Sequence, residues 1–157
     1  MLTLSKEALQ RWHGFDQSID RWLEERHELI ILLSDFASRR EFCNTNPQLV
    51  EKLHLFRSLL IDYISAGHFA IFQRLLEEGR TFEDHRAVEH GCRLLASIQP
   101  STRLALAFDE KYENFPGTSD LVADLSTLAE ALVSRFHIED QMIGILHDRH
   151  MALAAVS

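Results

Sequence analysis

The chain has 157 residues, of which 46% are hydrophobic and 25% are charged, and its formal net charge is −8 at pH 7. This length predicts a single domain over residues 1–157 with a substantial core. The negative charge argues against direct binding to nucleic acid, because polyanions bind basic surfaces. The same charge suits a soluble protein or one that attracts a basic protein partner.

No segment predicts export or membrane insertion. The longest apolar run, residues 29–33, is far shorter than the roughly 18 residues that cross a bilayer. The first residues lack the basic and long apolar stretches of a secretory signal. Cys43 and Cys92 match no metal-binding or redox spacing. We therefore expect a cytoplasmic protein that has free thiols and no metal or other cofactor.

The first part of the chain predicts two helices. A short helix over residues 4–12 is expected to end at Gly14, since glycine commonly terminates helices. A long helix over residues 15–37 follows, with apolar residues at helical spacing. Arg26 falls on its apolar face, so we expect this arginine to pair with a carboxylate of another helix.

The longest helical pattern covers residues 47–78. Asn46 and Pro47 form a strong start signal, and Gly79 predicts the end of the helix. Gly67 lies inside this helix, where glycine costs about 1 kcal/mol relative to alanine. Close packing of a neighbouring backbone would explain the glycine, and so would a tolerated local weakness.

The 47–78 helix is apolar on two sides. One side is an ordinary core stripe, composed of Leu53, Phe56, Leu60, Tyr63, Ile64, Gly67, Ile71 and Leu75. The opposite side should be charged, but it carries Leu55, Leu59, Ala66, Phe69 and Ala70, with Asp62 and Ser65 among them. A helix of this kind is either central or presents its second side to a partner. The carboxylate of Asp62 would then suit a cationic contact.

Two further long helices complete the prediction. The third covers residues 83–114, and Pro100 should kink or break it. The fourth begins at a cap formed by Thr118 or Ser119 and reaches Met151. No segment shows the alternation of a strand. The expected fold is therefore all-α, an antiparallel up-down four-helix bundle with a short extra N-terminal helix.

Two Glu-x-x-His spacings raise an enzymatic alternative, because diiron carboxylate bundles use such pairs projecting inward from two helices. They are Glu24 with His27 and Glu51 with His54. On a helical wheel these residues lie about 100–160° from the apolar stripes, so they should face water. A metal-carboxylate enzyme therefore remains the alternative, and we expect neither a metal site nor catalytic residues.

Three histidines allow more than one interpretation. His147 and His150 could hold a metal on one helical face, but we find no inward carboxylate to accompany them. Their position near the end of the last helix favours an interaction with the helix dipole. His68 lies at the edge of the core stripe, where a hydrogen-bonded structural role is favoured over catalysis.

Glu139 falls in the middle of the apolar stripe of the fourth helix, so it should be buried. A buried carboxylate needs a cation, for which the candidates are Arg26, Arg74 and His68. A polar lock that sets helix register is the favoured interpretation of this residue.

Three groups of residues resemble one known family. They are Asp20-Arg21-Trp22-Leu23 with Glu25-Arg26, the string Asp62-Tyr63-Ile64-Ser65-Ala66-Gly67-His68-Phe69, and Glu130-Ala131-Leu132 with Arg135-Phe136 and Glu139-Asp140. In order and spacing they resemble the Rsd/AlgQ family of bacterial anti-sigma factors, the regulators of sigma D. The resemblance covers nearly the whole chain.

The resemblance implies a non-enzymatic regulator that acts as growth slows into stationary phase. It implies that the protein binds the primary sigma factor of RNA polymerase, chiefly at region 4 of sigma. This binding keeps sigma from core polymerase and from the promoter. The family's important aspartate corresponds to Asp62. We expect partner contacts at Asp20, Leu59, Asp62, Ser65, Ala66 and Phe69. A weak homodimer, packed through the second apolar side in the absence of sigma, is a third interpretation.

Overall fold

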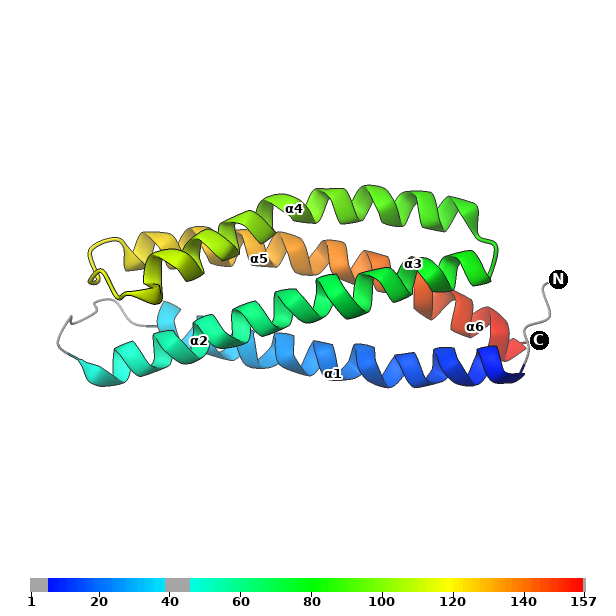
Figure 1. The fold of residues 1–157 in the computed structure, drawn as a ribbon, viewed down its shortest axis with the longest axis horizontal. Helices are drawn as coiled ribbons and strands as arrows, with labels where there is room; N and C mark the ends of the chain where they lie inside the picture. Colours follow the sequence, from blue (N-terminus) through cyan, green and yellow to red (C-terminus); the bar gives the residue numbers. More distant parts are fainter. Residues whose placement is uncertain (1–5, 39–45, 157) are drawn as a thin grey trace.

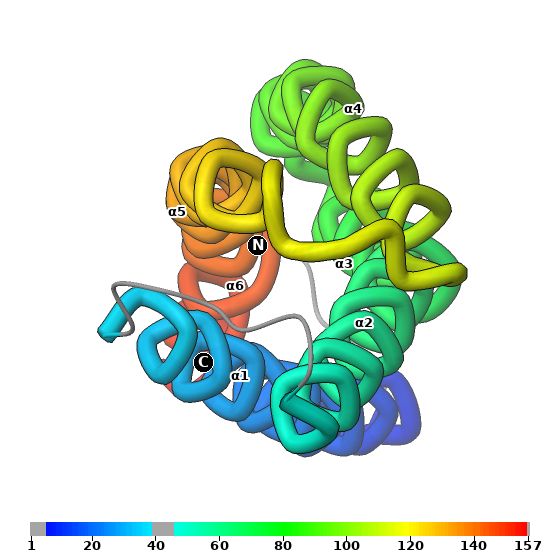
Figure 2. The backbone as a smooth tube through the Cα atoms, turned by 90° about the vertical axis from the view of Figure 1, so that its left-hand side faces the viewer, coloured from blue at the N-terminus to red at the C-terminus, as the bar shows by residue number. Residues whose placement is uncertain are grey.

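The computed structural model describes residues 6–38 and 46–156, and over these ranges its elements are all helical. Its elements are α1 (Lys6–Ala37), α2 (Pro47–Ala66), η1 (Gly67–Ile71), α3 (Phe72–Thr81), α4 (His85–Glu113), α5 (Leu121–Ile143), η2 (Gly144–Asp148) and α6 (Arg149–Val156). Because η1 and η2 are single π-helical turns, the helix continues through each of them. Over the described ranges the chain therefore forms four helical columns, which are α1, α2–η1–α3, α4 and α5–η2–α6. The columns surround a common core, and the chain reverses direction from each to the next (Figures 1 and 2). The predicted all-α bundle is confirmed.

The predicted short N-terminal helix is wrong as a separate element. Helix α1 continues through Gly14, which is exposed and has open space where a β-carbon would lie. The buried side chains of Trp12 and Phe15 lie on either side of this glycine. Their packing outweighs a propensity cost of about 1 kcal/mol. The predicted start of the short helix and Cys43 lie outside the described residues.

The second column begins as predicted but ends later. The Asn46 side chain accepts a hydrogen bond from the backbone N–H of Gln48 at 3.0 Å, as an N-cap does. The column continues past Gly79 to Thr81, and Glu83 then takes a positive φ of 56°. The predicted stop at Gly79 is therefore wrong.

Both glycines of this column allow close packing. A β-carbon on Gly67 would lie 2.8 Å from Cζ2 of Trp22, and one on Gly79 would lie 2.7 Å from Cγ2 of Val88. No larger residue fits at either position without displacing its neighbour. Close packing thus explains Gly67, although the neighbour is a tryptophan side chain and not a backbone.

The π-helical turn η1 rotates the buried side of this column. All residues of the predicted core stripe are buried. After η1, Phe72 and Leu76 are buried as well, although a wheel at 100° per residue places them off the stripe. A π turn holds more residues than an α turn, so later positions rotate relative to an ideal helix. Periodicity alone does not reveal this rotation.

Proline does not break α4, which runs through Pro100 from an N-cap at Asp84. Pro100 is exposed, and α4 changes direction along its length in Figure 1. Helix α5 begins at Leu121, and its N-cap is Asp120. The predicted cap at Thr118 or Ser119 is therefore wrong, although the Thr118 carbonyl accepts a hydrogen bond from the N–H of Leu121 at 3.2 Å. The apolar stripe predicted for this helix is buried.

A buried carboxylate joins α1, α2 and α5. Glu139 is fully buried and accepts hydrogen bonds from the Tyr63 hydroxyl at 2.5 Å, Arg26 Nη2 at 3.2 Å and Arg135 Nε at 3.1 Å. Arg26 Nε also donates to the Tyr63 oxygen at 3.0 Å. Arg135 reaches further, to the hydroxyl of Thr102 on α4 at 2.7 Å. All four columns are thus connected by one network.

The expected burial of Glu139 and its pairing with Arg26 are confirmed. Arg74 instead lies over the ring of Phe15, 4.2 Å from its centroid. Burial and the neighbouring Glu139 carboxylate raise the pKa of Tyr63 far above its usual range, so its hydroxyl remains a neutral donor.

A second network holds η2 against α3 and α1. The buried His147 contacts Glu78 through Nδ1 and Asp16 through Nε2, each at 2.7 Å. Burial lowers the pKa of His147, but the hydrogen bonds to the two carboxylates outweigh it and raise this pKa above the ordinary value. The imidazole therefore carries its charge to higher pH than a free histidine.

The second column, Pro47–Thr81, is also long and apolar enough by composition to cross a membrane. The side chains of Phe56, Leu60 and Leu75 on it are fully buried within the bundle. Burial of this kind is what the central helix of a globular protein requires, so we interpret the column as a core helix.

We expect Glu139→Gln to lower the free energy of unfolding by about 3 kcal/mol, because Arg26 and Arg135 would lose their buried counter-charge. Urea denaturation would measure the change. Glu130→Gln, on the exposed side of the same helix, is the matched control and should change stability by less than about 0.5 kcal/mol. Equal losses in the two variants would contradict a stabilising network.

We expect His147→Gln to lower the free energy of unfolding by about 1–3 kcal/mol at pH 6, since Glu78 loses its charged partner. Because the pKa of His147 is raised in the folded state, its stabilisation is complete below about pH 6.5 and is lost as pH rises through the folded pKa. The parent chain should therefore lose more stability between pH 6 and pH 8 than the variant. Parallel pH profiles would contradict this, and His137→Gln, at an exposed site, should behave as the parent.

Candidate partner-binding surface

One side of α2 and η1 carries exposed and half-buried apolar residues around one carboxylate, and the half-buried Leu59 and Ala66 pack partly against the core. The members of this side, which we call the outward face, are Leu55, Leu59, Asp62, Ser65, Ala66 and Phe69. Phe69 is 79% exposed and Leu55 is 52% exposed. Asp62 is exposed, and the other three residues are half-buried. The predicted outward orientation of Asp62 and Phe69 is confirmed, whereas a role in binding remains a prediction.

Contacts around Tyr63 set the orientation of this face. The Tyr63 ring stacks on Trp22 with centroids 4.8 Å apart, and its carbonyl accepts a hydrogen bond from Trp22 Nε1 at 3.0 Å. Arg26 binds the Tyr63 hydroxyl. Consecutive side chains on a helix point about 100° apart. Arg26 and Tyr63 point inward toward one another. Glu25 and Asp62, the residues directly before them, therefore point away from the core and lie beside one another.

Glu25 of α1 and Asp62 of α2 form an acidic pair. Burial raises the pKa of Glu25, the carboxylates of Asp62 and Glu28 raise it further, and Arg21 opposes the rise. Glu25 Oε2 is buried and has no hydrogen-bond partner within residues 6–38 and 46–156, a property that it shares with Glu78 Oε1. A guanidinium group from another protein would supply both the missing donor and the missing positive charge.

Asp20 belongs to α1, whereas the other predicted contacts belong to α2 and η1. Asp20 is exposed, but it lies five positions before Glu25 and hence about 140° around α1 from it. The five predicted contacts on α2 and η1 lie together. Sequence reasoning did not select Glu25, because its position beside Asp62 depends on how α1 packs against α2.

The residues of the enzymatic alternative lie on the surface. Glu24, His27, Glu51 and His54 are all exposed, as predicted. Glu51 and His54 line a shallow hollow of about 420 Å³ beside Leu55. Among the residues that the structure describes, no group of three or more histidine, cysteine, aspartate or glutamate side chains is placed to hold a metal ion.

The histidines differ from their predictions. His147 and His150 are buried, and each meets a carboxylate from elsewhere in the chain. Glu78 of α3 meets His147, and Asp84, the N-cap residue of α4, lies 3.0 Å from Nε2 of His150. The expectation that no inward carboxylate accompanies them is therefore wrong, because Glu78 and Asp84 approach from elsewhere in the chain. His68, expected at the edge of the core, is exposed and packs edge-on against Phe69.

Comparison with known proteins agrees with the three groups of residues that resemble one family. The model of the Rsd/AlgQ family, described as regulator of the RNA polymerase sigma(70) subunit, matches residues 1–147. A protein named Regulator of sigma D from Yersinia enterocolitica is 29% identical over 148 residues, covering 91% of this chain and 88% of its own length. Proteins of the same name from Yersinia pseudotuberculosis and Salmonella typhi are 30% identical over 152 residues and 28% identical over 153 residues. They cover 91% and 94% of this chain, and 87% and 93% of their own lengths.

We expect Glu25→Gln to raise the free energy of unfolding at pH 7, since it removes a carboxylate that Asp62 and Glu28 repel. The gain should be roughly 0.2–0.5 kcal/mol, the cost of a close pair of like charges. Because the pKa of Glu25 is raised in the folded state, the gain should vanish as pH falls below about 4.5. Urea denaturation at both pH values tests this, with the exposed Glu24→Gln as control. A loss of stability at pH 7 would show that the carboxylate is satisfied.

Proposed function

This chain belongs to the Rsd/AlgQ family of regulators of the RNA polymerase sigma(70) subunit, and we propose that it is an anti-sigma factor whose outward face binds region 4 of the primary sigma factor. The observation that carries the proposal is the exposed Phe69 on the same face as Asp62, beside the unsatisfied carboxylate of Glu25. Apolar exposure and unbalanced negative charge coincide there, as they do on surfaces that a basic partner covers.

Charge complementarity supports this choice of partner. Region 4 recognises promoter DNA, so its binding surface is basic. The chain as a whole carries a formal net charge of −8, which would speed encounter with such a surface. An arginine of region 4 placed between Asp62 and Glu25 would neutralise both carboxylates, while Phe69 would bury its ring against the partner.

The proposed mechanism is occlusion. The regulator would cover the surface that sigma uses for the promoter, and no bond would be made or broken. This role requires the cytoplasm, where sigma and core polymerase meet. A homodimer through the same face is the competing arrangement. In a two-fold dimer the outward face of one chain contacts the same face of the other chain, so the two acidic pairs would lie close together. That repulsion favours a basic partner over a second copy.

We expect Asp62→Asn to weaken binding to purified region 4 by about 2–5 kcal/mol, the usual cost of breaking a desolvated charge pair. Isothermal titration calorimetry would measure the affinity, and circular dichroism would confirm that the helical fold is retained. Glu110→Gln, an exposed carboxylate on α4, is the control and should bind as the parent does. Unchanged affinity in the aspartate variant would remove Asp62 from the interface.

Two companion variants locate the surface further. Phe69→Ala should weaken binding without destabilising the chain, because its ring is 79% exposed in the free protein. Asp20→Asn tests whether the interface also includes the side of α1 that carries Asp20. A loss of affinity for region 4 comparable to that of Asp62→Asn would extend the interface to that side. Light scattering of the free chain tests the dimer, which sigma should dissociate if both use the outward face.

A further inference from the structure

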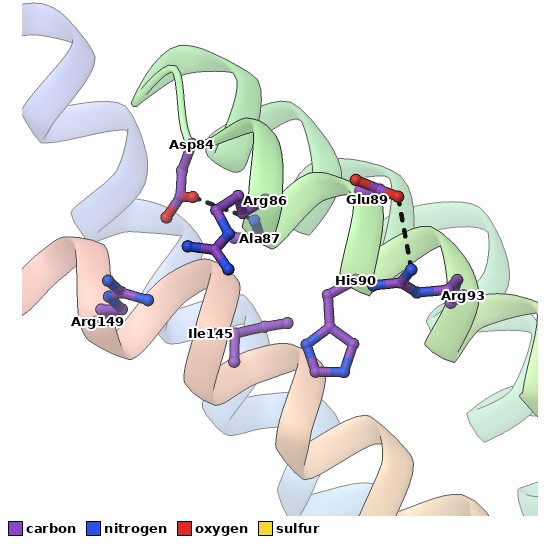
Figure 3. A pocket seen from close by; sticks show the side chains of 8 residues that line it. All are labelled: Asp84, Arg86, Ala87, Glu89, His90, Arg93, Ile145 and Arg149. Atoms are coloured by element: carbon purple, nitrogen blue, oxygen red, sulfur yellow. Dashed lines mark hydrogen bonds and ion pairs between the residues drawn. The ribbon is translucent and has the colours of Figure 1, made fainter.

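Three arginines from two helices line a cavity of about 500 Å³ at the start of α4. Arg86 and Arg93 belong to α4, and Arg149 belongs to α6 on the other side of the opening (Figure 3). His90 stands between them at the rim, and Ile145 of η2 contributes apolar surface. This concentration of guanidinium groups occurs in a chain whose formal net charge is −8.

The two carboxylates of this cavity are already engaged. Asp84 accepts a hydrogen bond from the N–H of Ala87 at 3.1 Å and lies 3.0 Å from Nε2 of His150. Glu89 accepts one from Arg93 at 3.5 Å. Within the described part of the chain, neither Arg86 nor Arg149 forms an ion pair. Neither guanidinium group is thus held by a direct ion pair there, although Arg149 lies near enough to Asp84 to help lower the pKa of that carboxyl.

The shape and lining of the cavity indicate the class of ligand. A volume of about 500 Å³ lies within the range of small-molecule sites. Guanidinium groups present paired N–H donors that match phosphoryl oxygens, and they keep their charge at every physiological pH. Of the eight lining residues, two, Ala87 and Ile145, are apolar. A ligand with several negative charges fits this lining better than an apolar one.

We propose that this cavity, the arginine pocket, binds a small phosphorylated metabolite through its phosphoryl oxygens. Arg86 and Arg149 bind the phosphoryl group from opposite sides, and Arg93 and His90 contact it at the rim. Occupancy would connect the start of α4 to α6 and stabilise the folded chain by an amount that rises with the logarithm of the ligand concentration. The pocket shares no residue with the outward face, so the proposal is independent of sigma binding.

Inorganic pyrophosphate is a suitable probe, titrated into the full chain at constant ionic strength and followed by calorimetry and thermal unfolding. We expect saturable binding with one site per chain and at least tenfold weaker binding of sulfate. The double variant Arg86→Gln/Arg149→Gln should bind pyrophosphate at least tenfold more weakly. Arg103→Gln, an exposed arginine elsewhere on α4, is the matched control and should bind as the parent does.

Backbone amide shifts in an NMR titration of the parent chain test the location without any substitution. Shifts confined to the start of α4 and to η2 and α6 would support the pocket. The proposal is overturned if pyrophosphate does not bind at millimolar concentration or if the amide shifts occur elsewhere in the chain. It is also overturned if Arg103→Gln loses as much pyrophosphate affinity as the double variant, or if an acidic peptide binds more tightly than pyrophosphate.

The two sites can be tested separately. The double variant should still bind region 4, and Asp62→Asn should still bind pyrophosphate.

Discussion

The buried carboxylate of Glu139 is the interaction on which the arrangement of this bundle depends. It brings together Arg26, Tyr63 and Arg135, and through them every column. Apolar stripes tolerate small rotations and shifts of a helix, whereas a fully desolvated charge requires its donors at fixed positions. The network therefore favours the helix register in which these donors meet the Glu139 carboxylate.

That register has a consequence on the surface. With Arg26 and Tyr63 held together inside, Glu25 and Asp62 are held together outside. In the free chain this arrangement leaves Glu25 and Asp62 in mutual repulsion and leaves one Glu25 oxygen without a hydrogen-bond partner. Sites that bind partners commonly retain such locally unfavourable groups, because the complex relieves them. The contact between α1 and α2 thus positions both the buried network and the acidic pair beside the outward face.

Much of the fold was predictable, but several boundaries were not. Gly14, Gly79 and Pro100 are all residues that commonly end helices, and none of them ends one here. Local propensity is worth about 1 kcal/mol for a glycine, which tertiary packing readily exceeds. Gly79 is needed for contact with Val88, and the turn at η1 rotates the core stripe without any sequence signal that periodicity detects.

By itself the sequence determined the all-α class, the core stripes, the burial of Glu139 and the outward position of Asp62 and Phe69. Each of these follows from the spacing of residues along one helix. Only the tertiary structure decided which distant groups meet. Examples are Glu25 with Asp62, Arg135 with Thr102, His147 between two carboxylates, and the arginines around one cavity. Most of these contacts join different helices, and a helical period specifies which side a residue faces but not which residue of another helix lies opposite.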